Sequence, residues 1–453
     1  MKVPMKILPL WVLCILQSGL VAAESTTETD TTTTSTASTE SSTSGTSGTS
    51  DADIIYVTSE SSVAVPTGDY ITYSTTETIS SAVLNATATG NSTGNATVTT
   101  TSATDVVIVG TGSSNSNSTA TTSSSTATNT QACNGHVDFC SRKYSNITMV
   151  TAHNSPFVKK NNIASNQDYT VTTQLDDGIR MVSFEAHYYE DEIYLCHTSC
   201  SLLNMGTLEA YLTTISKWIK KNPFEVVAIL IVNSDYVAPG NFSGPIQNSG
   251  LIDYAYRPSK VPMSLDDWPT LSEMILHGER AVVFMDYEAD QTDYPYILDE
   301  FSQMWETPFS PLNRSFPCTT QRPPGISTAN AEKRMYMANH NLNVEVVFDS
   351  LDILIPDPAQ INVTNAVSGY GSLGVMANNC RAEWDRPPNF LLVDYYDKGN
   401  FPGSVFQVAA EMNNVTYDGD CCGVSSDAPG SISRASSWLV GIVLFTTSLS
   451  YLL

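Results

Sequence analysis

The segment TLEAYLTTISKWIKKNPFEVVAILIV, residues 207–232, contains the pattern that decides the fold of this 453-residue chain. Its first part predicts an amphipathic helix over Thr207–Lys220, because its apolar residues recur at helical spacing. These residues are Leu208, Tyr211, Leu212, Ile215 and Ile219. Its last part, Val226–Val232, is continuously apolar and rich in β-branched residues, as is typical of a parallel strand buried on both faces.

The same alternation of strands and helices extends over about 290 residues, from Cys133 to Gly423. Further strands are expected at Ile147–Ala152, Ile179–Phe184, Ile193–Cys196, Ala281–Met285, Met335–Ala338 and Phe390–Val393, and further helices at Leu271–His277 and Pro402–Met412. Polar residues cluster just after the strands, and no glycine-rich phosphate loop follows the first one, which favours a barrel over a doubly wound sheet. We expect residues 132–424 to adopt an α/β fold, a TIM-type (β/α)8 barrel. The pattern leaves open whether all eight strand–helix units are regular.

Residues 1–23 have the composition of a secretory signal peptide. Lys2 and Lys6 precede the apolar run Ile7–Leu16, and the small residues Val21-Ala22-Ala23 suit a cleavage site. The alternative is a signal anchor that stays in the membrane. It is disfavoured because the apolar run is shorter than the roughly 20 residues that a span needs.

Residues 24–131 are dominated by Ser and Thr, and contain a single proline, Pro66. They hold too little apolar material to offset the entropy of ordering. The composition predicts a disordered, O-glycosylated, extended stalk. The more apolar patch Asp53–Val65 is either a short strand pair or a sticky segment within the stalk.

Residues 425–453 resemble an attachment signal for a glycosylphosphatidylinositol (GPI) anchor. Small residues around Ser426 are followed by a polar spacer and by the apolar tail Trp438–Leu453. Ser426 is the preferred attachment residue, with Ser425 and Gly430 close behind. The alternative is a transmembrane helix, which the short tail and its four Ser and Thr residues disfavour.

Cysteine usage indicates an oxidising compartment. Cys14 leaves with the predicted signal peptide, and eight cysteines remain at positions 133, 140, 196, 200, 318, 380, 421 and 422. An even number in an exported chain predicts up to four disulfides, with the connectivity left open. None of the cysteines has zinc-finger spacing, so a structural zinc site is not expected.

Nine N-x-S/T sequons also indicate an extracellular glycoprotein, at Asn85, Asn91, Asn95, Asn117, Asn146, Asn241, Asn313, Asn362 and Asn414. The net charge of −25 argues against a nucleic-acid partner and against simple electrostatic docking on anionic lipid head groups. We expect a secreted protein that a GPI anchor holds at the cell surface, at the plasma membrane or the cell wall.

Three titratable residues follow predicted strands. His153 comes directly after the first one, His197 follows a later one, and Asp394 ends the last. Such residues at the carboxyl ends of separate barrel strands converge on one mouth, where barrel active sites lie. Two histidines can act there as general base and general acid, and a buried carboxylate can orient one of them. The alternative for each histidine is a structural role at a strand end.

From about Cys133 to Asn413 the chain resembles the X-domain of phosphatidylinositol-specific phospholipase C, especially its secreted fungal, phospholipase C-like phosphodiesterase relatives. The matching segments are Ala152–Ser155, Gln174–Arg180, Leu195–Cys200, Asn222–Val227 and Val393–Tyr395. The resemblance implies that His153 removes a proton from an inositol hydroxyl and that His197 protonates the departing glycerol oxygen. It also implies that Asp394 fixes the tautomer of His153.

Two positions depart from the family pattern. Bacterial members have an aspartate after the first histidine, where this chain has Asn154, and a phosphate-binding arginine at the place of Glu185. Arg180 lies earlier in the same strand, where the family more often uses arginine for structure. We take Arg180 and Tyr395 as candidate substrate-binding residues. His187, two positions after Glu185, is expected to face the same mouth by strand alternation.

The missing arginine raises the hypothesis of a bound Ca²⁺. Eukaryotic members of the family place calcium in this part of the mouth. Asn154, Glu185 and a third residue, Asn233 or alternatively Asp235, offer the oxygen ligands that this cation prefers. The ion would hold a phosphate oxygen as a Lewis acid. The alternative is that Glu185 pairs with a nearby cation such as Arg180 or Lys159.

The sequence thus favours a phosphoric diester hydrolase that acts on an inositol phospholipid or a similar diester. A second hypothesis is a non-catalytic cell-wall or adhesion glycoprotein on the same barrel. A third is a metal-dependent barrel phosphodiesterase of the sphingomyelinase D or glycerophosphodiesterase type. The expected partners are a phosphodiester lipid and, through the anchor, the membrane.

Overall fold

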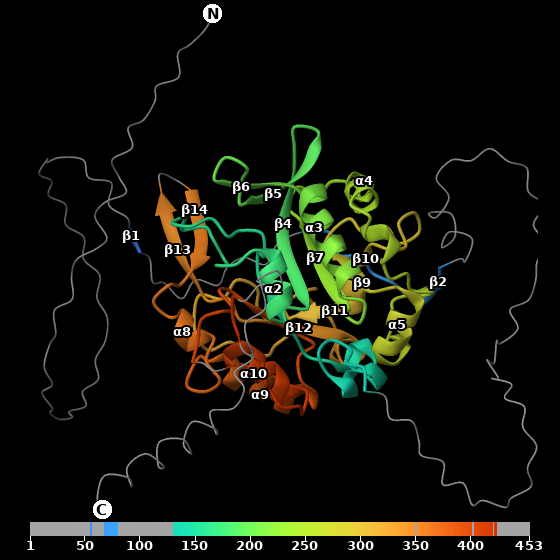
Figure 1. Ribbon diagram of the computed structural model, residues 1–453. Coiled ribbons are helices and arrows are strands. Elements are labelled where there is room, and N and C mark those ends of the chain that lie inside the picture. Colours follow the sequence, from blue (N-terminus) through green and yellow to red (C-terminus); the bar gives the residue numbers. More distant parts are fainter. Residues whose placement is uncertain are drawn as a thin grey trace, which may run out of the picture. The chain divides into compact units, whose positions relative to one another are not determined.

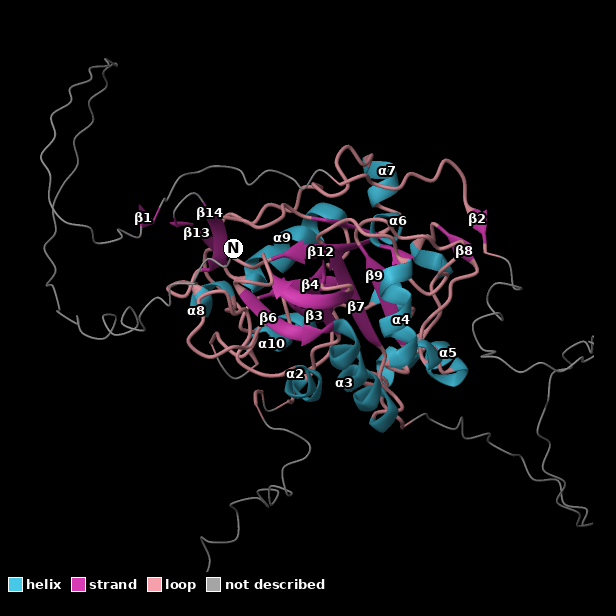
Figure 2. Ribbon diagram, turned by 90° about the horizontal axis from the view of Figure 1, so that it is seen from above, coloured by secondary structure: helices cyan, strands magenta, loops and turns pink. Residues whose placement is uncertain are grey.

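Eight parallel strands form one curled sheet in the computed structural model of the protein, which describes residues 55–56, 68–79, 130–348, 351–400, 403–419 and 421–423. In spatial order the strands are β10 (Leu298–Asp299), β9 (Ala281–Met285), β7 (Val227–Asn233), β4 (Met181–Tyr189), β3 (Met149–Ala152), β15 (Phe390–Val393), β12 (Met335–Asn339) and β11 (Met304–Glu306). Figures 1 and 2 show the sheet from two directions, with helices outside it. The predicted barrel-type α/β fold is confirmed.

The sheet joins its first and last strands but stays open at one place. β3 pairs with β15, so that Ala152 lies opposite Val393. Within the described ranges no ladder joins β10 to β11. β10 has two residues and runs straight into the four-residue helix α6 (Glu300–Gln303), which leaves no length for a regular strand–helix unit. The barrel is therefore irregular.

Helices cover the outside of the sheet close to where the sequence predicts them. The helix expected at Thr207–Lys220 is α3 (Leu208–Lys221), and the Thr207 side chain caps it by accepting from the amide of Ala210. α5 (Leu271–His277) has its predicted bounds, and the helix expected at Pro402–Met412 is α10 (Ser404–Met412). The other helices are α2 (Val171–Asp177), α4 (Gly240–Asn248), α7 (Thr328–Ala331), α8 (Ile361–Thr364) and α9 (Leu373–Trp384).

Strand side chains alternate between two packed layers, as the pleat requires. One layer fills the barrel and includes Met149, Met181, Leu230, Phe284, Met335, Met337, Phe390 and Leu392. The other layer packs under the helices and includes Val150, Val182, Phe184, Ile229, Ile231, Val283, Ala338 and Val393. Because the interior is a packed apolar core, polar chemistry is confined to the ends of the strands.

Two antiparallel hairpins lie outside the parallel sheet. β4 runs on beyond the barrel and turns back as β5 (Glu192–His197), which pairs in turn with β6 (Leu203–Thr207). The strand predicted at Ile193–Cys196 therefore exists but is not a barrel strand. The second hairpin, β13 (Asn343–Phe348) and β14 (Leu351–Pro356), pairs with β1 (Ile55–Tyr56), and the sequence pattern did not predict it.

Residues 68–79, within the segment predicted as stalk, contact the barrel. β2 (Glu77–Thr78) pairs antiparallel with β8 (Lys260–Val261), as Figure 2 shows. The ring of Tyr70 lies 5.5 Å from that of Tyr287 and 4.9 Å from that of Phe301, measured between centroids. Tyr287 follows β9 and Phe301 follows β10, so this segment packs beside the end of the sheet that β10 forms at the open place. We call residues 68–79 the strap.

The eight cysteines expected in the exported chain are all paired. The disulfides are Cys133–Cys140, Cys196–Cys200, Cys318–Cys380 and Cys421–Cys422. The predicted signal peptide, the C-terminal signal with Ser426 and most of the predicted stalk lie outside the described residues. None of the helices in the described ranges has the length and apolar character of a membrane span.

Candidate active site

Polar side chains gather at the carboxyl ends of the parallel strands, which we call the mouth. His153 directly follows β3, and Asp394 directly follows β15. Asp286 follows β9, and Asn339 ends β12. These residues come from segments far apart in the sequence, and the closure of the sheet places them at one end of the barrel.

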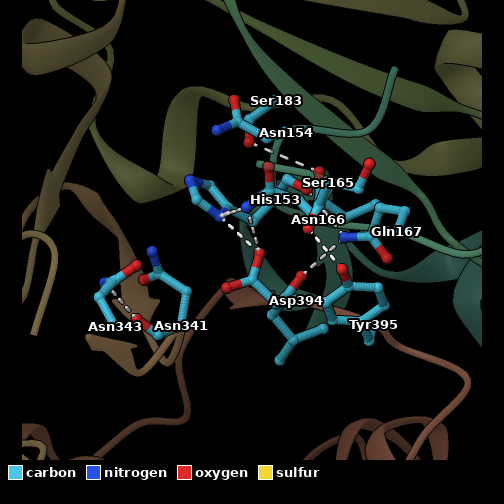
Figure 3. Close-up of polar contacts among 12 residues, drawn as sticks. His153, Asn154, Ser165, Asn166, Gln167, Ser183, Asn341, Asn343, Asp394 and Tyr395 are labelled. Carbon is cyan, nitrogen blue, oxygen red and sulfur yellow. Dashed lines mark hydrogen bonds and ion pairs between the residues drawn. The ribbon is translucent and has the colours of Figure 1, made fainter. Parts of the chain in front are cut away.

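His153 and Asp394 form a hydrogen-bonded pair. The imidazole Nδ1 lies 2.8 Å from Asp394 Oδ1 (Figure 3). The side chain of His153 is 18% exposed, and that of Asp394 is fully buried. Burial alone lowers the pKa of His153, but Asp394 and then Glu185 outweigh it, so the pKa is raised. Asp394 favours the tautomer with the proton on Nδ1, which leaves Nε2 as the atom able to accept a proton.

Two further residues hold this pair in place, and the sequence reasoning missed both. Asn166 donates from Nδ2 to Asp394 Oδ1 over 2.9 Å, and the same nitrogen lies 3.3 Å from His153 Nδ1. Gln167 donates to the backbone carbonyls of His153 and Val393, and so ties the ends of β3 and β15 together. Both residues lie in a loop, where no periodic pattern marks them.

Tyr395 supports the same loop. Its amide donates to the carbonyl of Asn166, and its hydroxyl donates to the carbonyl of Ser165 (Figure 3). Burial and then the charge of Asp394 raise the pKa of Tyr395 to about 12, so the phenol stays neutral. Its hydroxyl is thus engaged with the protein, although the sequence analysis took Tyr395 as a candidate substrate-binding residue.

His197 reaches the mouth by a different route from the one expected. It is not at the end of a barrel strand, because β5 is the returning arm of the hairpin that extends β4. The Cys196–Cys200 disulfide closes a short loop around it. His197 is 5% exposed, and its ring lies 5.1 Å from that of Phe157. Burial lowers the pKa of His197, although Glu185 opposes the shift, and His153 lowers the pKa further.

Glu185 lies between the segments that carry the two histidines. Its Oε1 accepts from Asn154 Nδ2 over 3.3 Å, and its Oε2 accepts from the Thr198 amide over 2.6 Å. Neither Arg180 nor Lys159, the cations suggested by the sequence, is its partner in these bonds. The carboxylate raises the pKa of both His153 and His197.

The structure does not assemble the calcium site suggested by the sequence. By strand alternation Glu185 lies on the same side of β4 as Met181, which faces the inside of the barrel. Asn233 lies on the same side of β7 as Ile231, which faces the covering helices. The Asn233 side chain donates to the carbonyls of Val237 and Tyr287 and accepts from the Val237 amide. The described residues contain no group of three His, Cys, Asp or Glu side chains that could hold a metal ion. Asn154, Glu185 and Asn233 therefore do not fit a calcium ion.

Arg180 lies at the end of the barrel opposite the mouth, because it precedes β4. Its Nε and Nη2 each lie 2.9 Å from Glu225 Oε2, and its Nη1 donates to the carbonyls of Leu175 and Ile179. The guanidinium also lies over the ring of Trp218. The structure thus places this candidate substrate-binding residue in a structural contact.

A buried arginine that the sequence analysis did not single out spans the open side of the barrel. Arg322 Nη1 lies 3.0 Å from Glu306 Oε2 at the end of β11, and Nη2 lies 3.3 Å from Asp286 Oδ2 after β9. Nη2 also donates to the Tyr287 hydroxyl. Burial, only partly offset by Arg322, raises the pKa of Asp286 to about 6. Arg322 joins the two strands that flank β10, and its charge is engaged by carboxylates.

Two other histidines lie near the mouth. His187, expected there by strand alternation, lies 3.1 Å from Asp235 Oδ1 through its Nδ1. His340 is buried, and its Nε2 lies 2.9 Å from the carbonyl oxygen of Thr364. Burial lowers the pKa of His340 to about 3, so it is a neutral structural residue.

Sequence comparisons relate this chain to a known family. Residues 139–413 match the sequence profile of the PI-PLC X family (PI-PLC X 1). The chain belongs to the PI-PLC X family. A PI-PLC X domain-containing protein 1 of Arthroderma benhamiae is 41% identical over 271 residues, which cover 59% of this chain and 86% of that protein.

Other relatives extend the comparison. An uncharacterized secreted protein of A. benhamiae is 62% identical over 296 residues, which cover 65% of this chain and 67% of the relative. A PI-PLC X domain-containing protein of Arabidopsis thaliana is 27% identical over 271 residues, 58% of this chain and 59% of that protein. The solved phosphatidylinositol-specific phospholipase C from Listeria monocytogenes is similar with a TM-score of 0.39 at 13% identity, covering 60% of this chain and 95% of that one.

Proposed function

We propose that this PI-PLC X family protein is a phosphoric diester hydrolase of the phospholipase C type. The observation that carries the proposal is the His153–Asp394 pair at the mouth, with His197 held nearby by the β4–β5 hairpin. A lipid phosphodiester such as an inositol phospholipid is the substrate class that the family and the site support.

In the proposed mechanism His153 Nε2 accepts the proton of a substrate hydroxyl, which attacks the phosphorus to give a cyclic phosphodiester. His197 donates a proton to the leaving glycerol oxygen. The roles then reverse, so that His197 takes a proton from water and His153 returns one to the ring oxygen as the cyclic phosphodiester opens. Asp394 keeps the imidazole of His153 oriented throughout.

In the free protein, the directions in which the pKa values of the two histidines are shifted suit the second step, the opening of the cyclic phosphodiester. The pKa of His153 is raised and that of His197 is lowered, and ring opening begins with His153 protonated and His197 neutral. The first step needs the opposite arrangement. An anionic phosphate next to His197 favours its charged form, so substrate binding promotes the part of that arrangement that concerns His197.

The test is an assay of the purified full-length chain on a panel of phosphodiesters, with added calcium and with chelator. The panel contains an inositol phospholipid, a glycosylphosphatidylinositol, a choline phospholipid and a cyclic inositol phosphate. We expect turnover of an inositol diester that chelator leaves unchanged. Activity on the choline lipid alone, or only with metal, would instead favour a metal-dependent barrel phosphodiesterase.

One observation favours a second candidate, a non-catalytic surface glycoprotein on the same barrel. Glu185 places a negative charge where bacterial members carry a phosphate-binding arginine, and Arg322 is engaged by Asp286 and Glu306. A phosphodiester gains less charge neutralisation at such a mouth. Absence of turnover on the whole panel by a correctly folded protein supports this candidate.

For localisation we propose secretion and attachment through a GPI anchor at or near Ser426. The relative from A. benhamiae named as a secreted protein supports the export of this chain. All sequon asparagines within the described residues are exposed, which suits N-glycosylation: Asn146, Asn241, Asn313, Asn362 and Asn414. Treatment of intact cells with an external phosphatidylinositol-specific phospholipase C should release the protein. Retention while a control anchored protein is released would contradict the anchor.

A further inference from the structure

The carboxylate of Glu185 connects the two residues that directly follow His153 and His197. Oε1 accepts from the side-chain amide of Asn154, and Oε2 accepts from the backbone amide of Thr198. Asn154 in turn accepts through Oδ1 from the backbone amide of Glu185 over 3.3 Å. One side chain on β4 is thus bonded to both histidine-bearing turns.

Both of these turns contain a residue with left-handed backbone geometry. Asn154 has φ 47° and Thr198 has φ 60°, in the left-handed region. Asparagine tolerates this region, but for a β-branched residue such as threonine it is strained. Such a conformation persists only where surrounding contacts over-determine it. The 2.6 Å bond from the Thr198 amide to Glu185 and the Cys196–Cys200 disulfide are contacts of that kind.

The position of Glu185 also explains why it does not need a cation. Its oxygens receive two N–H donors, and hydrogen bonds to a carboxylate stabilise its charged form. The neighbouring turns therefore engage both carboxylate oxygens of Glu185. Glu185 is on the inward-facing row of β4 by its parity with Met181, and it is bonded to both histidine turns.

We propose that Glu185 is a positioning residue that acts on both histidines through the turns that follow them, and so sets the placement of His153 relative to His197. This inference rests on the proposed diesterase function for its kinetic part only. It replaces the expectation that Glu185 is a metal ligand. The upward contribution of Glu185 to the pKa of both histidines agrees with it.

The experiment compares Glu185→Gln and Glu185→Ala in the full chain, with Glu192→Gln as the control. Glu192 is an exposed glutamate on the neighbouring strand β5, so its variant makes the same charge change away from the turns. The Glu185→Gln variant keeps an acceptor for the Thr198 amide and loses the charge. We expect kcat to stay within about 10-fold and the NMR-titrated pKa values of both histidines to fall.

Glu185→Ala removes both bonds. We expect kcat to fall by about 10² with little change in KM, and amide hydrogen exchange at Thr198 to accelerate while the barrel strands stay protected. Unchanged histidine pKa values in both variants, or an unchanged exchange rate at Thr198, would overturn the proposal. The titrations and the exchange need no turnover, so an inactive wild type would defeat the diesterase function and still leave this inference decided.

Discussion

His153 Nδ1 lies 2.8 Å from Asp394 Oδ1, although 241 residues separate them in the chain. The two residues directly follow β3 and β15, whose parallel pairing places Ala152 opposite Val393. The pair therefore forms only when the first and last strands of the barrel are joined. Any substitution that loosens this pairing is expected to act on the site as well as on stability.

Asp394→Asn should lower any diesterase activity by about 10² or more, because it removes the charge that orients the His153 imidazole. Burial lowers the pKa of His153, and Asp394 raises it. Without that charge the pKa falls, so the acidic limb of the kcat/KM profile moves to lower pH. The measurement is a pH–rate profile together with an NMR titration of His153. Asp293→Asn, at an exposed position, is the control and should change neither.

His153→Ala and His197→Ala should each lower diesterase activity by roughly 10² or more. The protein should still fold, since His153 is partly exposed and His197 sits in a loop closed by a disulfide. Circular dichroism melting checks the fold, and His277→Ala, at an exposed helix end, is the matched control. An enzyme whose activity survives both active-site substitutions would rule out the two-histidine mechanism.

Asp299→Asn should flatten the pH dependence of stability. Burial raises the pKa of Asp299 to about 7, above its usual value, so the folded state binds this proton more tightly than the unfolded state. Its contribution to stability is complete below about pH 4 and is lost as the pH rises toward 7, by about 1.4 kcal/mol per pH unit. Asparagine keeps the N-cap bond to the Ser302 amide and does not titrate.

The measurement for Asp299 is the free energy of unfolding in urea at several pH values between about 4 and 7.5, the window set by its ordinary and raised pKa values. The free energy of unfolding of Asp299→Asn should vary less steeply with pH than that of the wild type, by the contribution of one titrating group. The slope for Asp266→Asn should equal that of the wild type, because Asp266 is 96% exposed. Equal slopes for Asp299→Asn and the wild type would contradict the raised pKa.

Deletion of residues 1–129 should destabilise the barrel more than deletion of residues 1–67, because only the longer deletion removes the strap. Tyr70→Ala alone should cost about 1–2 kcal/mol, since it removes the ring contacts with Tyr287 and Phe301. Thermal melting of these variants and the wild type is the measurement, with Thr75→Ala at an exposed strap position as the control. Identical melting of the two deletion variants would show that the strap does not stabilise the fold.

Much of the fold could be predicted because local pattern and global structure agree. The runs Ala281–Met285 and Phe390–Val393 are continuously apolar and form strands with their predicted bounds. β10 and β11 escaped prediction because two or three residues carry no detectable period. The strap escaped because it lies in a segment whose composition is typical of disorder.

The sequence by itself determined the class of fold and the residue types at the strand ends, because burial periodicity and strand length are local properties of the chain. It therefore led to His153, His197 and Asp394. Only the tertiary structure decided how they are held. Asn166 and Glu185 act through bonds to residues distant in sequence, and Asn233 is removed from the site by the parity of its strand. Loop contacts and the register between strands depend on the whole barrel, so no window of the sequence contains them.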